Sequence, residues 1–571
     1  MEMLQIDEKR RSILATTGHL LVEGGPGSGK TTISLLKAGE LALAKTLLPS
    51  QKVLFLSFAR ATISRIIEHA GTLIEKEAIK SLEINTYHGF TWELIKSYGY
   101  LASQQRCLTL VTPPEAAALS AHITEDKKRE FEVALFKEHG RLCFDLFAPI
   151  AGEILASEKI ASLVSNKYPL IIVDEFQDTN IDEWNIIKLI GKQSTIVALA
   201  DPRQRIYDFR GSSITRIPEF ISEFSCTKVD LGYENFRSGG TDIAQFGDDL
   251  LTGRNKNTTY NKVIINKYSK NWQDSYAALR YEVLRSIDRL KKGNVKNWSI
   301  AILVKSGRVS LAVSRALSTR VGGIPAISHE VLIDPSGPSL AAKVIAFLLE
   351  PIASTESCRK SLLLGIIQHL RGRKNGKPSQ ADLTLATALE KYHSSGVIRG
   401  STRVQLAGEL LEVVEKRQLI NFTGTPADDW LLIRKLFENC SNPTLKNIFE
   451  DALYVRLLNK GALLNESLSE RWRNNGSYQG ASGVIESALL QEHFSMSNRK
   501  WNGIFIMTIH KSKGKEFDEV IIWEDEFKRL VPNNANETDI DRTKLALRVA
   551  VTRAKRQTTI LTPISDPCVL L

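Results

Sequence analysis

The sequence predicts an α/β protein built on parallel sheets, and two observations carry this prediction. Short apolar runs bounded by turns recur in two groups along the 571 residues, which is typical of strands buried on both faces. A glycine-rich loop follows the first run and precedes a segment of helical periodicity. Because one hydrophobic core does not grow to this size, we expect three or four domains or subdomains.

The apolar runs predict ten strands. They lie at residues 19–24, 52–58, 170–176, 195–201 and 227–233 in the first group, and at 262–268, 299–305, 504–510, 519–525 and 557–563 in the second. A long segment of mainly helical character interrupts each group, at residues 91–165 and 336–499. The pattern is compatible with two copies of one fold, each carrying a helical insertion.

Composition narrows the class of protein. The net charge of +11, from 75 basic and 64 acidic residues, favours an acidic polymer as partner, most obviously nucleic acid. The six cysteines lie far apart without a CxxC pair, so neither a zinc site nor a disulfide framework is expected. We find no apolar run long enough to span a membrane and no signal peptide, and therefore expect a soluble, cytoplasmic protein without a membrane partner.

The segment VEGGPGSGKTT (22–32) has the spacing of the phosphate-binding loop of an NTPase. The candidate nucleotide-binding residues are Gly24, Gly25, Gly27, Ser28, Gly29, Lys30, Thr31 and Thr32. Lys30 can reach the β- and γ-phosphates of ATP, and the Thr31 hydroxyl can hold Mg²⁺. A helix that starts here directs its positive end at the same phosphates. A chance glycine-rich turn is the alternative, and the order of strand, loop and helix argues against it.

A second candidate site lies at the end of the apolar run in LIIVDEFQDTN (170–180). Ligands of open α/β sheets bind beyond the carboxyl ends of strands, so acidic residues there can face the glycine-rich loop. We expect Asp174 to hold Mg²⁺, through water, and Glu175 to orient or deprotonate the attacking water. A solvated acidic strand end is the alternative reading of the same residues.

Six further segments resemble motifs of the UvrD/Rep/PcrA family of superfamily-one DNA helicases. They are LSFARAT (56–62), NTYHGF (85–90), ADPRQRIYDFRGS (200–212), LGYENFRS (231–238), MTIHKSKGKEFDEV (507–520) and VAVTRAK (549–555), and they occur in family order. With the two nucleotide motifs, the resemblance runs from residue 22 to residue 555. It covers the whole chain apart from the insertions.

The resemblance implies two tandem RecA-like P-loop NTPase domains with ATP between them. The first would contain residues 1–90 and 166–245, with the insertion 91–165, and the second residues 246–335 and 500–571, with the insertion 336–499. Arg237 and Arg553 match the family's arginine fingers, and Gln204 matches its sensor of the γ-phosphate. With Lys30 and Glu175 they complete the expected catalytic set. An ordinary ion pair or a structural amide hydrogen bond is the alternative for these side chains.

The same resemblance implies further contacts to nucleotide and DNA. Phe236 matches the residue that packs on adenine and Glu516 the acid that contacts the ribose, although a core phenylalanine and a solvated carboxylate remain alternatives. The residues that match the family's path for single-stranded DNA are Phe58, Arg60, His88, Tyr207, Phe209, Arg210 and His510. Aromatic side chains would stack on bases there, while cations follow the phosphates.

The chain departs from the family pattern at three positions. Lys9 stands where the family has an adenine-reading glutamine, so nucleotides other than ATP are open. Lys515 replaces an apolar residue in the fifth motif, and Arg548 replaces a tyrosine in the sixth.

The activity implied by the resemblance is ATP- and Mg²⁺-dependent movement, 3′-to-5′, along single-stranded DNA, with unwinding at single/double-strand junctions. The alternative is a DNA-stimulated regulatory or sensor subunit that unwinds little and works with a nuclease partner, as in Gabija-type antiphage defence. DNA repair and antiviral defence are both open as pathways.

Overall fold

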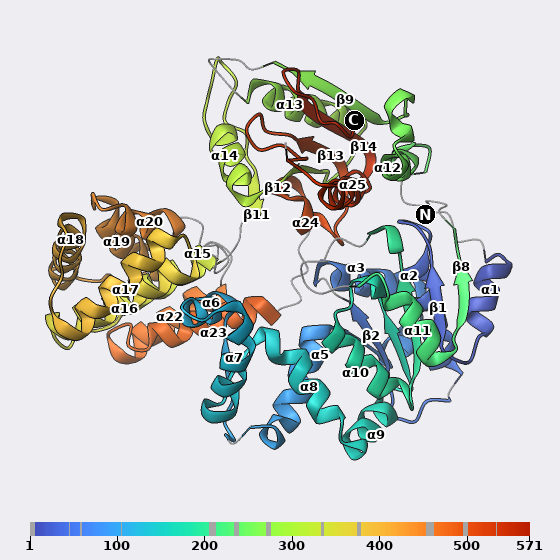
Figure 1. Cartoon of the computed structure of the whole chain (residues 1–571), viewed down its shortest axis with the longest axis horizontal. Coiled ribbons are helices and arrows are strands. Elements are labelled where there is room, and N and C mark those ends of the chain that lie inside the picture. Colours follow the sequence, from blue (N-terminus) through green and yellow to red (C-terminus); the bar gives the residue numbers. More distant parts are fainter. Residues whose placement is uncertain are drawn as a thin grey trace. The chain divides into compact units, whose positions relative to one another are not determined.

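A computed structural model of the chain describes residues 6–44, 46–57, 60–103, 105–204, 213–232, 239–269, 276–332, 336–373, 378–452, 462–494, 501–532 and 534–571. The chain forms two compact units (Figure 1). The first, called the sheet unit, comprises Met1–Leu94, Ala148–Ile333 and Met496–Leu571. The second, called the helical unit, comprises Ile95–Phe147 and Asp334–Ser495.

The first sheet of the sheet unit has the strand order β3-β2-β6-β7-β1-β8, and every pairing is parallel. Its strands are β1 (Leu20–Glu23), β2 (Val53–Ser57), β3 (Leu82–Thr86), β6 (Leu170–Val173), β7 (Thr195–Ala200) and β8 (Thr227–Asp230). The register sets Val22 opposite Leu199 and Ile171 opposite Ile196. The carboxyl ends of β1, β6 and β7 therefore meet at one edge of the sheet.

Helices precede, connect and follow these strands along the chain. They are α1 (Glu8–Ala15), α2 (Lys30–Leu43), α3 (Arg60–Leu73), α4 (Lys76–Ile79), α5 (Tyr87–Tyr98), α8 (Phe147–Leu155), α9 (Glu158–Lys167), α10 (Ile181–Gly191) and α11 (Arg216–Phe224). Parallel strands need such crossovers because each must re-enter the sheet from the same end. The Lys37 ammonium on α2 donates to the carbonyls of Ile13 and Leu14, at 3.0 Å each, and so ties the end of α1 to α2.

The second sheet, also in the sheet unit, has the order β11-β12-β10-β13-β14-β9 and is again wholly parallel. Its strands are β9 (Val263–Tyr268), β10 (Ser299–Val304), β11 (Glu330–Leu332), β12 (Gly503–Thr508), β13 (Phe517–Trp523) and β14 (Ala554–Pro563). Segments far apart in sequence lie side by side here, as Figure 1 shows for β9 (green) and β14 (red).

The helices of this second half are α12 (Ile243–Thr252), α13 (Ala277–Lys292), α14 (Gly307–Ser318), α24 (Ile509–Ser512) and α25 (Glu537–Val551). Phe246 of α12 and Leu547 of α25 belong to one buried cluster with strands of the second sheet. Both helices are therefore parts of the second sheet's core, which fixes where their polar side chains can point.

The helical unit has a core of its own around Trp430, Ile345 and Leu410. It contains α6 (Pro113–Ser120), α7 (Glu125–His139), α15 (Ser336–Leu349), α16 (Thr355–Gly372), α17 (Gln380–Ser395), α18 (Ser401–Gln418), α19 (Pro426–Glu438), α20 (Pro443–Ala452), α22 (Ala462–Asn475) and α23 (Ala481–Phe494), with the two-stranded pair β4 (Thr109–Val111) and β5 (Arg141–Cys143). Both sequence insertions contribute to this one unit.

The predicted fold class is confirmed, since both sheets are parallel and helices fill the insertions. All ten predicted strands are present, but the expectation that each is buried on both faces was wrong for β8 and β9. These two strands are largely exposed because each forms an edge of its sheet. The predicted boundaries of the four segments stay a prediction. Within the ranges described above, no helix combines the length and the apolar character needed to cross a membrane.

Candidate nucleotide-hydrolysis site

The glycine-rich loop after β1 depends on glycine for its backbone shape and for its packing. Gly27 and Gly29 have φ angles of +80° and +88°, in the left-handed region that costs glycine little. A Cβ on Gly24 would lie 2.6 Å from the Ser28 Oγ and 3.3 Å from the Gly232 carbonyl oxygen. Gly29 is also the N-cap of α2, so the loop leads directly into the positive end of that helix.

Lys30 is the first residue of α2, and its ammonium lies over the loop. It donates hydrogen bonds to the carbonyl oxygens of Gly24 at 2.6 Å and Gly25 at 3.0 Å. Thr31 and Thr32 follow in the same turn and are half-buried. The carbonyls hold the ammonium above the loop, where it can exchange these neutral acceptors for an anion.

Arg10 on α1 forms a hydrogen bond to the glycine-rich loop, and sequence reasoning missed this residue. Its guanidinium is 3% exposed and donates to the Ser28 carbonyl at 3.0 Å, while Asp7 pairs with the same group at 2.5 Å. An arginine among three consecutive basic residues carries no local signal for such a role. The contact between Arg10 and the loop forms only because α1 packs against α2.

Asp174 and Glu175 lie directly beyond the end of β6. Asp174 is buried, and its backbone N–H continues the sheet by donating to the Leu56 carbonyl at 2.8 Å. Glu175 has a φ of +53°, which is uncommon for a residue with a side chain and costs about 1–3 kcal/mol. Gln177 donates to the Glu175 carboxylate at 2.6 Å and accepts from the Asp201 backbone N–H at 2.9 Å. The Gln177 amide thus joins the ends of β6 and β7.

Positive charges surround the Glu175 carboxylate. Burial by itself raises the pKa of Glu175, but the charges of Lys513, Lys30 and Arg553 and the Gln177 hydrogen bond together lower that pKa below its ordinary value. Glu175 is therefore ionised throughout the neutral range.

Lys513 is buried, at 4% exposure, and sequence reasoning did not select it. It comes from the segment between β12 and β13, in the second sheet. Its ammonium pairs with the Asp178 carboxylate, donates to the Gln204 carbonyl at 2.8 Å and lies 3.7 Å from Glu175 Oε2. The sequence signal for Lys513 was its position in the segment 507–520, between the selected residues His510 and Glu516.

Gln204 and Arg553 form a second connection between the two sheets. Gln204 follows β7, and its side-chain Nε2 donates to Asp201 Oδ2 at 2.8 Å. Its Oε1 accepts from the Arg553 guanidinium at 3.1 Å, while Arg553 Nε donates to the Val549 carbonyl at 2.9 Å. The structure therefore brings together Lys30, Glu175, Gln204 and Arg553 of the predicted catalytic set.

The remaining predicted residues are more scattered. Glu516 lies 3.8 Å from the ammonium of Lys555, His88 is half-buried in the first turn of α5, and His510 is exposed on α24. Lys9 donates to the Asp230 carbonyl at 2.7 Å, at the end of β8. Phe58, Tyr207, Phe209, Arg210, Phe236 and Arg237 lie outside the described residues, and of Arg60 only the backbone, at the start of α3, is described.

Comparisons with known proteins identify the family of this chain. The family model "UvrD/REP helicase N-terminal domain" matches residues 6–144 and 136–225, and the "UvrD-like helicase C-terminal domain" matches residues 466–563. Together these matches cover more than half of the chain. The chain belongs to the UvrD-like family of superfamily-one DNA helicases.

Relatives match this UvrD-like helicase over different shares of its length. A "Probable DNA helicase II homolog" of Rickettsia conorii is 20% identical over 96% of this chain and 91% of its own length. The "ATP-dependent DNA helicase Rep" of Escherichia coli is 22% identical over 41% of each chain. The solved Pif1 helicase of Candida albicans aligns with 56% of each chain at 14% identity, with a TM-score of 0.27 that is too low to bear on the fold.

Proposed function

We propose that this UvrD-like helicase is an ATP-driven motor that moves 3′-to-5′ along single-stranded DNA and separates duplex at junctions. The observation that carries the proposal is the hydrogen bond between Gln204 and Arg553. One residue stands at the carboxyl edge of the first sheet and the other belongs to the second. If a nucleotide binds at this edge, side chains from both sheets can contact the same phosphoryl group.

The residues present suit a nucleoside triphosphate with Mg²⁺. Gly27 and Gly29 take the left-handed conformation that lets a loop direct backbone N–H groups at phosphate oxygens, and the Lys30 ammonium lies over this loop. Thr31 and Asp174 supply the oxygen ligands that Mg²⁺ prefers. When bound, the ion would neutralise part of the phosphate charge.

Each catalytic residue then has a defined task. Lys30 moves from the loop carbonyls to the phosphates, and Glu175 orients the attacking water. Arg553, together with Arg237, offsets the negative charge that spreads over the γ-phosphoryl oxygens, an effect worth ~10³–10⁵ in rate for arginine fingers. Gln204 lies next to both the nucleotide edge and Arg553, which suits a residue that senses the γ-phosphate.

We assign the strand path and the base pocket by family position. Phe236 packs on the base and Glu516 contacts the ribose. The DNA residues are Phe58, Arg60, His88, Tyr207, Phe209, Arg210 and His510. Lys9 offers a cation where the family has an amide, so we propose that GTP is hydrolysed as well as ATP.

A strand-displacement assay tests the proposal. Purified protein receives duplexes with a 3′ or a 5′ overhang, with ATP or GTP, and with Lys30→Ala as the inactive control. We expect displacement from the 3′ overhang only, and hydrolysis that rises strongly when single strands are added. Hydrolysis that is indifferent to single strands would refute the motor. DNA-stimulated hydrolysis without displacement would instead favour the regulatory subunit that works with a nuclease.

A further inference from the structure

Arg548 is fully buried and lies between two carboxylates that belong to different sheets. It replaces the tyrosine of the family pattern and sits on α25, in the core of the second sheet. Its Nε donates to Asp248 Oδ1 at 2.8 Å, and Asp248 is on α12 in that same core. Its Nη1 lies 3.4 Å from Oδ2 of Asp201, which follows β7 in the first sheet. One guanidinium therefore joins the second sheet to the end of β7.

The carboxylate oxygen that Arg548 contacts is the one that orients Gln204. Asp201 Oδ2 accepts the Gln204 Nε2 hydrogen bond at 2.8 Å. With its nitrogen held by Asp201, the amide can present only its oxygen to Arg553, and this hydrogen bond is 3.1 Å long. Whatever fixes Asp201 therefore also fixes which end of the Gln204 amide faces the arginine finger.

We propose that Arg548 is a positioning residue that holds Asp201 so that Gln204 presents its amide oxygen to Arg553. The proposal rests on the proposed function, in which Gln204 and Arg553 take part in hydrolysis. Through Arg548, a displacement of the second sheet moves Asp201 as well as Arg553. The second sheet therefore acts on the Gln204 amide through two contacts: directly through Arg553, and through Arg548 by way of Asp201.

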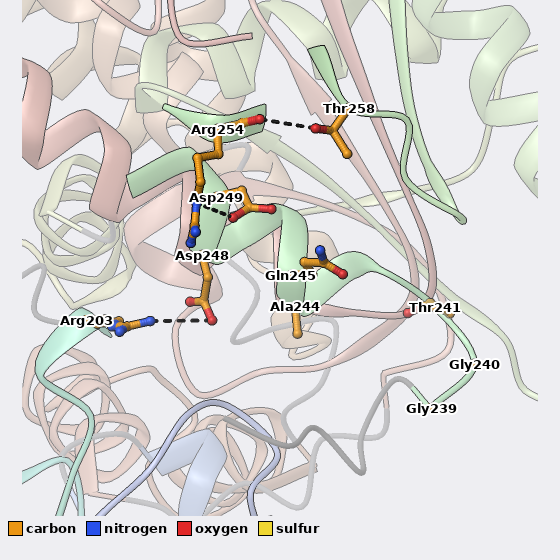
Figure 2. A pocket seen from close by; sticks show the side chains of 10 residues that line it. All are labelled: Arg203, Gly239, Gly240, Thr241, Ala244, Gln245, Asp248, Asp249, Arg254 and Thr258. Carbon is orange, nitrogen blue, oxygen red and sulfur yellow. Dashed lines mark hydrogen bonds and ion pairs between the residues drawn. The ribbon is translucent and has the colours of Figure 1, made fainter. Parts of the chain in front are cut away.

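The surroundings favour arginine over the tyrosine of the family pattern. A phenol cannot supply charge-assisted hydrogen bonds to two carboxylates, and it would leave Asp201 and Asp248 without this cation. A Cβ on Gly247 of α12 would lie 3.3 Å from Arg548 Cγ, so the glycine lets α12 approach the arginine stem closely. Arg203 of the first sheet lies 3.6 Å from the other oxygen of Asp248. Figure 2 marks this ion pair with a dashed line. Positive and negative groups alternate along this interface: Arg203, Asp248, Arg548 and Asp201.

A double-mutant cycle tests the assignment. We would measure ATP hydrolysis with and without single-stranded DNA for Arg548→Met, Asp201→Asn and the double variant. We expect each single variant to lower the DNA-stimulated kcat by about 10- to 100-fold. The double variant should be no slower than the slower single variant, because both changes release the same amide. Arg548→Lys should recover part of the rate, since an ammonium still reaches one carboxylate.

Arg289→Met is the matched control. Arg289 also lies between two carboxylates, Glu282 at 2.8 Å and Glu519 at 2.8 Å, but all three belong to the second sheet and its helices. Its loss should lower the urea midpoint of unfolding and leave the DNA-stimulated kcat within about twofold. A role of Arg548 in stability alone would give Arg548→Met this same behaviour.

Two outcomes would overturn the inference: a kcat for Arg548→Met equal to that of Arg289→Met, or losses that multiply in the double variant. If Arg548→Met does not fold, Asp248→Asn, which removes the anchor but keeps the arginine, takes its place in the cycle. If wild-type hydrolysis ignores DNA, the motor proposal fails, and the same cycle on DNA-free hydrolysis still decides the role of Arg548.

Discussion

The side-chain oxygen of Gln204 accepts a 3.1 Å hydrogen bond from the guanidinium of Arg553, although 349 positions separate the two residues. Gln204 belongs to the first sheet, whose edge carries the glycine-rich loop, and Arg553 to the second. Because the hydrogen bond depends on where the two sheets lie, any nucleotide-driven movement between them must change it. This dependence links hydrolysis to mechanical work in the proposed motor.

Removing the Lys513 ammonium should destabilise the sheet unit. Lys513→Met leaves the buried Asp178 and the half-buried Glu175 without the cation that contacts both, and breaking a buried pair such as Lys513–Asp178 costs about 3–5 kcal/mol. We expect a lower urea midpoint at pH 7.5. Lys515→Met is the control, because the Lys515 ammonium contacts the Lys511 carbonyl and the Trp501 ring instead. Equal midpoints for the two variants would contradict the assignment.

The pH dependence of this loss follows from the sign of the Glu175 shift. In the wild type the pKa of Glu175 is lowered, so its stabilising contribution is present above the ordinary carboxyl value and is lost as the pH falls through the lowered value. Without Lys513 the pKa of Glu175 is higher than in the wild type, so the folded variant takes up this proton at a higher pH than the folded wild type does. The difference in midpoint between Lys513→Met and the wild type should therefore shrink from pH 7.5 to pH 5.

Replacing Glu175 should affect chemistry far more than binding. Glu175→Gln keeps the shape of the side chain but removes the charge that orients water, and we expect hydrolysis to fall by about 10²–10⁴. Nucleotide affinity, measured by fluorescence titration, should change little. Because the pKa of Glu175 is lowered, the wild-type kcat should not decline from this group until the pH falls below the ordinary carboxyl range. A Glu175-dependent decline near pH 6 would argue against this electrostatic description.

Lys30 and Lys37 lie on the same helix and should behave differently. Lys30→Ala removes the cation at the loop opening, so we expect kcat to fall by about 10²–10³. Lys37→Ala removes the hydrogen bonds from the Lys37 ammonium to the carbonyls at the end of α1. This variant should have a lower thermal midpoint, while the folded protein still hydrolyses nucleotide. Hydrolysis and melting curves of both variants separate the two roles. Loss of hydrolysis in both would mean that the effect is structural.

The helical unit offers a test of packing that is independent of nucleotide. A Cβ on Gly372 of α16 would lie 2.5 Å from the Pro114 carbonyl oxygen, and backbone cannot move aside cheaply. Gly372→Ala should therefore cost about 1–3 kcal/mol of unfolding free energy. Gly408→Ala on α18 is the control, since nothing lies within 4 Å of its added methyl group and helix propensity favours alanine by about 1 kcal/mol. Urea unfolding should shift the two variants in opposite directions.

Apolar runs sufficed to predict ten strands because a strand buried in a parallel sheet needs a continuous apolar sequence. They did not reveal β3, where the run LEINT is half-buried throughout, or β11, which has only three residues. The exposure of β8 and β9 was also missed, because a strand's place at the edge of a sheet is set by its neighbours.

The loop at 24–31 and the acids Asp174 and Glu175 were selected from sequence because their chemistry is local. Glycines, a lysine and a strand end lie within a few positions of one another, and backbone geometry follows from that spacing. The sequence by itself therefore determined the two parallel sheets, the helical insertions and the nucleotide-binding candidates.

Tertiary structure alone decided that Arg10, Lys513 and Arg548 belong to the same region. Each is an ordinary basic residue in its own segment, and each acquires its role from a carbonyl or carboxylate on another element. The physical reason is that a charge becomes decisive only where burial removes its water, and burial is a property of the assembled sheets rather than of any stretch of chain.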